Sequence, residues 1–108
     1  MIDLLKIRFK GLNDNEIIES LYENYVEVDE AEYGNSCFGE FAHILQSKDS
    51  PMLWVYYERR VNYKQWRTEA YFTCCLEGNG EEVSELFYAF NDMAEAYYKN
   101  NNTVAGGN

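Results

Sequence analysis

Two stretches of the chain place hydrophobic residues at the three- and four-residue intervals of an amphipathic helix. The first extends over about residues 14–26, and its apolar positions are Ile17, Ile18, Leu21, Tyr22 and Tyr25. The second extends over about residues 81–98, and its apolar positions are Val83, Leu86, Phe87, Phe90, Met93, Ala94 and Tyr97. Each stretch follows an asparagine that stands three residues before a glutamate, as in a capping box: Asn13 with Glu16, and Asn79 with Glu82. We therefore predict two main helices.

Three other stretches have the patterns of β-strands. Residues 5–10 alternate apolar and basic side chains, as a half-buried strand does. Residues 52–61 and 66–77 are rich in aromatic and β-branched side chains, which strands favour. The short segment 62–65 between them predicts that these two strands pair as an antiparallel hairpin.

The segment between the first helix and the hairpin has weaker patterns. Residues 29–36 are acidic and include Gly34-Asn35, which indicates a loop. In residues 37–46, four apolar side chains fit helical spacing, so we predict a short helix on Phe38, Phe41, Ala42 and Leu45. Gly39 opposes that interpretation by about 1 kcal/mol.

Together these elements predict an α+β fold with the order β-α-(α)-β-β-α. A small antiparallel or mixed sheet of about three strands would hold the two main helices on one face. We expect a single domain over residues 1–99 and a flexible tail over residues 100–108, which are polar and contain glycine. The first twelve residues contain four charges, so we expect neither a signal peptide nor a membrane span there.

Composition narrows the classes of partner. The chain has 108 residues, of which 46% are hydrophobic, and a formal net charge of −10. Such a charge disfavours direct binding to nucleic acid or to an anionic membrane, and it favours attraction to a basic protein. Three cysteines without metal-site spacing favour a reducing compartment, and we predict the cytoplasm.

The acidic residues are concentrated where the helices are predicted. Residues 13–32 contain eight acidic side chains and no basic one. Four of them recur on the side of the first helix opposite its apolar face: Glu16, Glu19, Glu23 and Glu27. We predict that these four bind a partner, and that five further residues extend the surface: Asp29, Glu30, Glu32, Glu85 and Tyr88.

No pattern in the sequence specifies catalytic chemistry. The single histidine, His43, has no cysteine or histidine at the spacing of a metal site, and a structural role is its default interpretation. Gly78-Asn79-Gly80 is too short for a phosphate-binding loop and leads into acidic residues. We predict no enzyme activity, no cofactor and no metal site.

In size and charge the chain is similar to small acidic proteins that mimic nucleic acid, such as phage-encoded inhibitors of host nucleases and defence systems, and to toxin-immunity proteins. This resemblance implies an inhibitor that presents its acidic helix faces to a basic protein, such as one that binds nucleic acid. The main alternative is a structural module that self-associates, as a homodimer for example, through a sheet face with Trp54, Tyr56, Arg60 and Arg67. A third reading, a single-strand nucleic-acid binder that stacks bases on the sheet, is opposed by the net charge.

Overall fold

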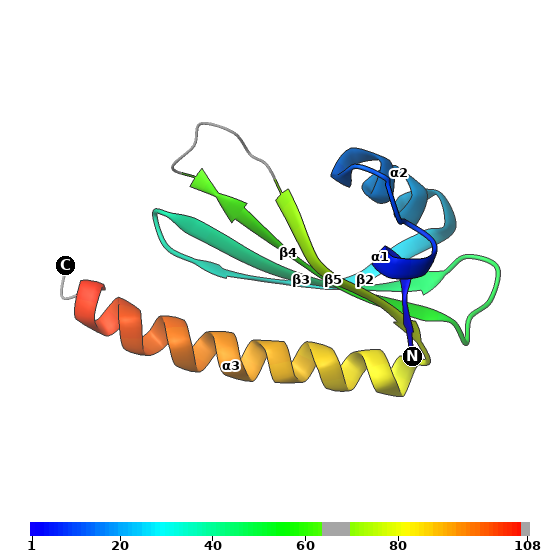
Figure 1. Cartoon of the computed structure of the whole chain (residues 1–108). Helices are drawn as coiled ribbons and strands as arrows, with labels where there is room; N and C mark the ends of the chain where they lie inside the picture. The colour runs from blue at the N-terminus through cyan, green and yellow to red at the C-terminus, as the bar shows by residue number, and fades with distance from the viewer. Residues whose placement is uncertain (64–69, 107–108) are drawn as a thin grey trace.

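The computed structural model of the chain is a five-stranded antiparallel sheet with helices on both faces (Figure 1). It describes residues 1–63 and 70–106. The strands lie in the order β1-β5-β4-β3-β2. The elements in chain order are β1 (Ile2–Asp3), α1 (Leu4–Ile7), α2 (Asp14–Asn24), β2 (Tyr25–Gly34), β3 (Phe38–Ser47), β4 (Trp54–Asn62), β5 (Ala70–Gly78) and α3 (Gly80–Gly106).

The α+β class agrees with the sequence pattern, but the predicted sheet of about three strands is wrong. Most of the short helix predicted at residues 37–46 is instead strand β3, an interior strand of the sheet between β4 and β2. Its residues 41–45 are all buried, because helices cover both faces of the sheet here. Such an uninterrupted apolar run occurs in buried strands and buried helices alike, so its spacing does not distinguish them.

Two other segments also differ from the prediction. Residues 29–36, expected to be a loop, belong mostly to strand β2, which forms an edge of the sheet. The strand expected at residues 5–10 is replaced by the short strand β1 and the single helical turn α1. Asp3 caps this turn by accepting a hydrogen bond from the backbone N–H of Leu5.

The hairpin of β4 and β5 confirms the predicted antiparallel pairing, with Trp54 opposite Gly78 and Val61 opposite Ala70. Residues 64–69, where the predicted loop ends and the return strand begins, lie outside the described part of the chain. Both main helices also start where expected, because Asn13 with Glu16 and Asn79 with Glu82 form reciprocal capping hydrogen bonds.

The expectation that both main helices cover one face of the sheet is wrong. Helix α2 lies on one face, and α3 lies on the other (Figure 1). Two hydrophobic clusters result. The α2-side cluster comprises Leu4, Phe9, Ile17, Leu21, Tyr25, Leu45, Val55, Tyr57 and Cys75. The α3-side cluster comprises Ala31, Ala42, Ile44, Tyr56, Val83 and Phe87. The sheet is therefore the middle of three layers.

Helix α3 has 27 residues, which corresponds to a length of about 40 Å. It continues into the segment for which the sequence predicts a flexible tail, and both that flexibility and the division at residue 99 stay predictions. None of the described helices combines the length and the apolar composition that crossing a lipid bilayer requires.

Candidate functional site

The outer face of α2 carries three of the four carboxylates that the sequence predicts for it. Ile17 and Leu21 are buried against the sheet, whereas Glu16, Glu19 and Glu23 are exposed on the opposite side of the helix. Glu16 is partly committed, since its Oε1 accepts the backbone N–H of Asn13 in the capping box. Within the described residues, the carboxylates of Glu19 and Glu23 form no ion pair. These two side chains are available to a partner.

Glu27 does not belong to the helical stripe, which is a correction to the sequence interpretation. Helix α2 ends at Asn24, and Glu27 lies on strand β2. Tyr25 begins this strand, and its side chain is buried in the α2-side cluster. The stripe on α2 therefore has three glutamates, with Glu27 on the adjoining strand.

A β-bulge in β2 decides which way its acidic residues point. The register shifts between Glu27, which is opposite Leu45, and Asp29, which is opposite Ile44. Residues directly opposite each other share a face of the sheet, so three glutamates lie on the α2 side: Glu27, Glu30 and Glu32. Asp29 lies on the α3 side, with Ile44.

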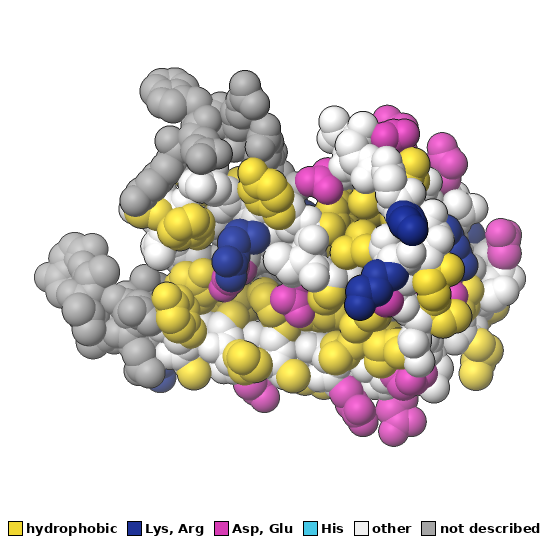
Figure 2. Space-filling view, in the orientation of Figure 1, with side chains coloured by type: hydrophobic (Ala, Val, Ile, Leu, Met, Phe, Trp, Pro, Cys, Tyr) yellow, Lys and Arg dark blue, Asp and Glu magenta, His cyan; other side chains and the backbone are white. Residues whose placement is uncertain are grey.

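Glu85 and Tyr88, the remaining two predicted contacts, lie on the outer face of α3, on the far side of the sheet from α2. Both are exposed, together with Glu81 and Asp92. In Figure 2, carboxylates are visible at the lower margin over α3 and at the upper right over α2, with hydrophobic side chains between them. The nine predicted residues therefore do not form one continuous ridge. Six of them share the α2 side.

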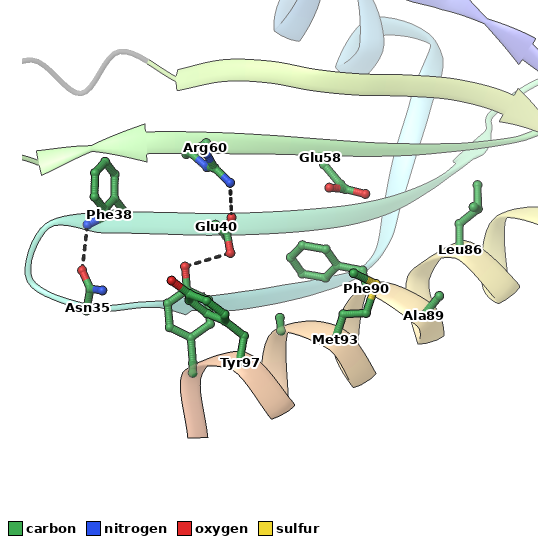
Figure 3. A pocket seen from close by; sticks show the side chains of 12 residues that line it. Asn35, Phe38, Glu40, Glu58, Arg60, Leu86, Ala89, Phe90, Met93 and Tyr97 are labelled. Atoms are coloured by element: carbon green, nitrogen blue, oxygen red, sulfur yellow. Dashed lines mark hydrogen bonds and ion pairs between the residues drawn. The ribbon is translucent and has the colours of Figure 1, made fainter. Parts of the chain in front are cut away.

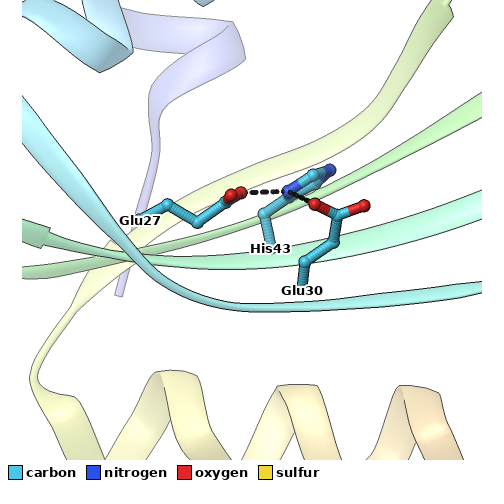
Figure 4. Close-up of side chains that lie close together, drawn as sticks. All are labelled: Glu27, Glu30 and His43. Carbon is cyan, nitrogen blue, oxygen red and sulfur yellow. Dashed lines mark hydrogen bonds and ion pairs between the residues drawn. The ribbon is translucent and has the colours of Figure 1, made fainter.

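The residue that sequence reasoning placed in a helix, His43, is the centre of a hydrogen-bonded cluster on the α2 side (Figure 4). Its side chain is 3% exposed. Nδ1 lies 2.5 Å from Glu27 Oε1 and 4.0 Å from Glu30 Oε2, and Nε2 accepts a hydrogen bond of 3.1 Å from Arg59 Nε. The imidazole stacks on the ring of Tyr57, with 4.3 Å between the centroids. The imidazole ring of His43 is therefore the common neighbour of Glu27, Glu30, Arg59 and Tyr57.

This geometry defines the protonation state of His43. Because Arg59 can only donate, Nε2 must hold a lone pair, and the proton sits on Nδ1, where it is donated to Glu27. Burial lowers the pKa of His43, against the raising effect of Glu27, and the Arg59 charge lowers it further. The ring is therefore a neutral imidazole held between an anion and a cation.

Glu27, Glu30 and His43 offer three ligand atoms within 4.8 Å of one another, a spacing that a metal ion could bridge. A metal would take the lone pair of Nδ1 and move the ring proton to Nε2, facing the N–H of Arg59. Two donors would then point at each other, and the guanidinium charge would lie beside the cation. The residues present fit a hydrogen-bonded network and do not fit a metal centre.

Burial holds two tyrosines beside this cluster and two cysteines of β5 in their protonated forms. Burial raises the pKa of Tyr22 to about 12 and also raises the pKa of Tyr57, whose hydroxyl lies 2.7 Å from that of Tyr22. Burial likewise raises the pKa of Cys74 and of Cys75 to about 12, whereas a nucleophilic thiol needs a lowered pKa. Within the described residues, every buried side-chain polar atom has a hydrogen-bond partner.

Sequence reasoning missed the His43 cluster because it did not recognise β2. A signal was present: Val26 and Val28 alternate with Glu27 and Asp29, as in a strand with one polar face. The bulge that breaks this alternation is a tertiary feature. No protein-family model, curated protein or solved structure matches this chain.

Proposed function

We propose that this protein is a non-catalytic inhibitor that binds a basic protein through the carboxylates on its α2 side. The observation that carries the proposal is the outer face of α2, where Glu19 and Glu23 point outward without a cation among the described residues. Glu30 and Glu32 on the adjoining edge strand extend this acidic surface. Asp29, Glu85 and Tyr88 lie on the other side of the sheet and are excluded from it.

Like charges along one helix face oppose folding by a few tenths of a kcal/mol for each i, i+4 pair. Glu19 and Glu23 form such a pair. A lysine at either position would replace this repulsion by attraction. A basic partner supplies that relief on binding. Its main effect would be a faster and more specific association, because exposed charge pairs contribute more to steering than to affinity.

Affinity requires apolar contacts near the charges. We expect Ile7 and Leu12, which precede α2 in the chain and are 72% and 38% exposed, to make such contacts. A basic groove built for nucleic acid, with apolar walls, would match this combination of an acidic stripe and apolar margin. We propose a cytoplasmic location, because three cysteines without metal-site spacing favour a reducing compartment.

Of the four residues expected to form a self-association surface on the sheet, two are covered by α3, whereas Arg60 is exposed and Arg67 lies outside the described part of the chain. Tyr56 is 1% exposed beneath α3, and Trp54 is half-buried beside Gly80 at the start of that helix. The same cover removes the stacking platform that a single-strand nucleic-acid binder would need.

The test is a comparison of two double variants that remove the same charge from opposite sides of the sheet. A partner is first captured from an extract of the source cells, and its association rate with the wild-type protein is measured at several salt concentrations. We expect Glu19→Gln with Glu23→Gln to slow association about fivefold or more at low salt. Glu85→Gln with Asp92→Asn, on the outer face of α3, should have little effect. Salt should reduce the difference between the two.

Two results would overturn the proposal. Equal slowing by both double variants would mean that only net charge matters, and an association rate independent of salt would remove the electrostatic mechanism. A direct measure of inhibition completes the test: a nucleic acid bound by the partner should be displaced by the wild-type protein and much less by the α2 double variant.

A further inference from the structure

A groove of about 690 Å³ separates the middle of α3 from the sheet (Figure 3). Its helical wall is apolar and comprises Leu86, Ala89, Phe90, Met93, Ala94 and Tyr97. Its opposite wall is polar, because Glu40 on β3 and Glu58 and Arg60 on β4 point into it. The groove lies on the face of the sheet opposite the acidic surface of α2 and is independent of it.

The groove opens because the sequence of β4 changes from aromatic to charged beneath α3. Trp54, Tyr56, Glu58 and Arg60 alternate along the α3-facing side of that strand. Under the first half of α3, Tyr56 is buried with Val83 and Phe87. Farther along α3, its middle turns meet carboxylates and a guanidinium, which apolar side chains cannot cover without desolvating them.

The helix is nevertheless fixed along the groove by hydrogen bonds that join it to strands β2 and β3. Tyr33 Oη donates to Asn91 Oδ1 over 2.7 Å, and Tyr98 Oη donates to Glu40 Oε2 over 2.8 Å. The ring of Tyr33 also packs edge-on against Phe90. With α3 anchored at both its packed start and these contacts, the groove is preformed.

The polar groups in the groove are unequally satisfied. Both oxygens of Glu40 are engaged, one by Arg60 and the other by Tyr98, so that Arg60 is neutralised. Glu58 accepts a hydrogen bond of 2.6 Å from Tyr56 through Oε2. The Cys74 thiol also donates a hydrogen bond to this carboxylate, but its charge has no cation within 4 Å among the described residues. The groove thus contains one carboxylate without a counter-charge.

We propose that this groove binds small organic cations that combine an apolar or aromatic body with a protonated amine. The ammonium would bind Glu58, and the body would lie against Phe90, Met93 and Tyr97. The volume is within the range of small-molecule sites, which pair apolar walls with a few placed polar groups. An ammonium forms a charge-assisted hydrogen bond with a carboxylate and is attracted to aromatic faces, whereas an anion is repelled by the net charge of −10.

The probe is 1-naphthylmethylamine, which is protonated at neutral pH, compared with its neutral isostere 1-naphthylmethanol. Calorimetry gives both affinities, and amide chemical shifts locate the site. We expect the amine to bind at least about tenfold more tightly than the alcohol. The shifts should be largest for residues 86–97 and for the neighbouring parts of β3 and β4.

Two pairs of variants separate the charge from the shape of the groove. Glu58→Gln keeps an oxygen that can accept from Tyr56 but removes the charge, so the preference for the amine should disappear while the alcohol binds as before. Glu85→Gln removes the same charge from the outer face of α3 and should preserve the preference. Ala89→Trp should fill the groove and abolish binding of both probes, whereas Ala96→Trp, exposed and outside the groove, should not.

Three results would overturn the proposal. The first is equal affinity for the amine and the alcohol, and the second is a preference for the amine that survives in Glu58→Gln. The third is a concentration-dependent dimer, seen by sedimentation, that Ala89→Trp disrupts, because a second copy of the chain would then be the occupant of the groove.

Discussion

His43 on β3 donates its Nδ1 proton to Glu27 on β2 across 2.5 Å, and the β-bulge between Glu27 and Asp29 makes this pair possible. Without the extra residue, strict alternation would turn Glu27 to the α3 side of the sheet, away from the imidazole. The bulge therefore directs a carboxylate of the acidic edge strand toward the buried His43 on the neighbouring strand. It gives one carboxylate of the chain an internal partner while leaving Glu30 and Glu32 near the surface.

The first prediction concerns the pH dependence of folding. The folded-state pKa of His43 is lowered, so the unfolded chain takes up this proton first, near its ordinary pKa of about 6.5. The contribution of neutral His43 to the unfolding free energy is then complete above about pH 6.5. It is lost as the pH falls through that value toward the lower pKa of the folded state. Each unit of lowering corresponds to about 1.4 kcal/mol of unfolding free energy.

Urea unfolding at pH 7.5, 6.5 and 5.5 measures this effect against the variant His43→Gln. His43 is the single histidine of the chain, so no other side chain with an ordinary pKa titrates strongly in this range. The variant should be less stable at pH 7.5 but should have a flatter pH profile. Parallel profiles for the two proteins would contradict the assignment of a neutral His43.

The second prediction compares two glutamates on the same strand. Glu27 accepts from His43 and from the hydroxyl of Tyr22, so Glu27→Ala should lower the unfolding free energy by about 1–3 kcal/mol. Glu32→Ala relieves similar charge repulsion on the same face but removes no hydrogen bond found among the described residues, and we expect a change within about 0.5 kcal/mol. Thermal or urea denaturation of both variants at pH 7.5 decides this. Similar effects of the two substitutions would show that the network contributes nothing.

Local signals in the sequence were enough to predict both main helices. The capping pairs Asn13 with Glu16 and Asn79 with Glu82 involve residues three positions apart, and the structure forms both. The sheet was harder to predict, because residues 41–45 of β3 are buried on both faces and lack a strand alternation. Whether a helix covers one face or both is decided by elements distant in the chain, which local patterns do not contain.

The candidate site was predicted only in part for the same reason. The outward direction of Glu19 and Glu23 follows from helical periodicity alone, and the structure agrees. The direction of Glu27 depends on a bulge, and the position of Glu85 depends on which face α3 covers. The groove could not be foreseen either, since Glu58 and Phe90 meet only when α3 crosses the sheet.

The third prediction concerns the contact that fixes the second half of α3. Tyr98 is 6% exposed, and its hydroxyl donates to Glu40. Tyr98→Phe removes only that hydrogen bond and should lower the unfolding free energy by about 1 kcal/mol. Hydrogen exchange should accelerate in α3 after Asn91 and should change little near Val83. Tyr88→Phe, on the exposed outer face of α3, is the matched control and should leave both measurements unchanged.

The last prediction tests the start of α3, where Asn79 Oδ1 accepts the backbone N–H of Glu82 over 2.8 Å. Asn79→Ala leaves that N–H without its cap and should lower the unfolding free energy by about 1 kcal/mol. Asn79→Ser should retain most of the stabilisation by the cap, because a serine hydroxyl can also accept from this N–H. Asn15→Ala makes the same chemical change inside the first turn of α2 and should be neutral or slightly stabilising, because alanine is the better helix former. Urea denaturation compares all three variants. If Asn79→Ala and Asn15→Ala had equal effects, the capping box would not be what fixes the start of α3 against Trp54 and the sheet.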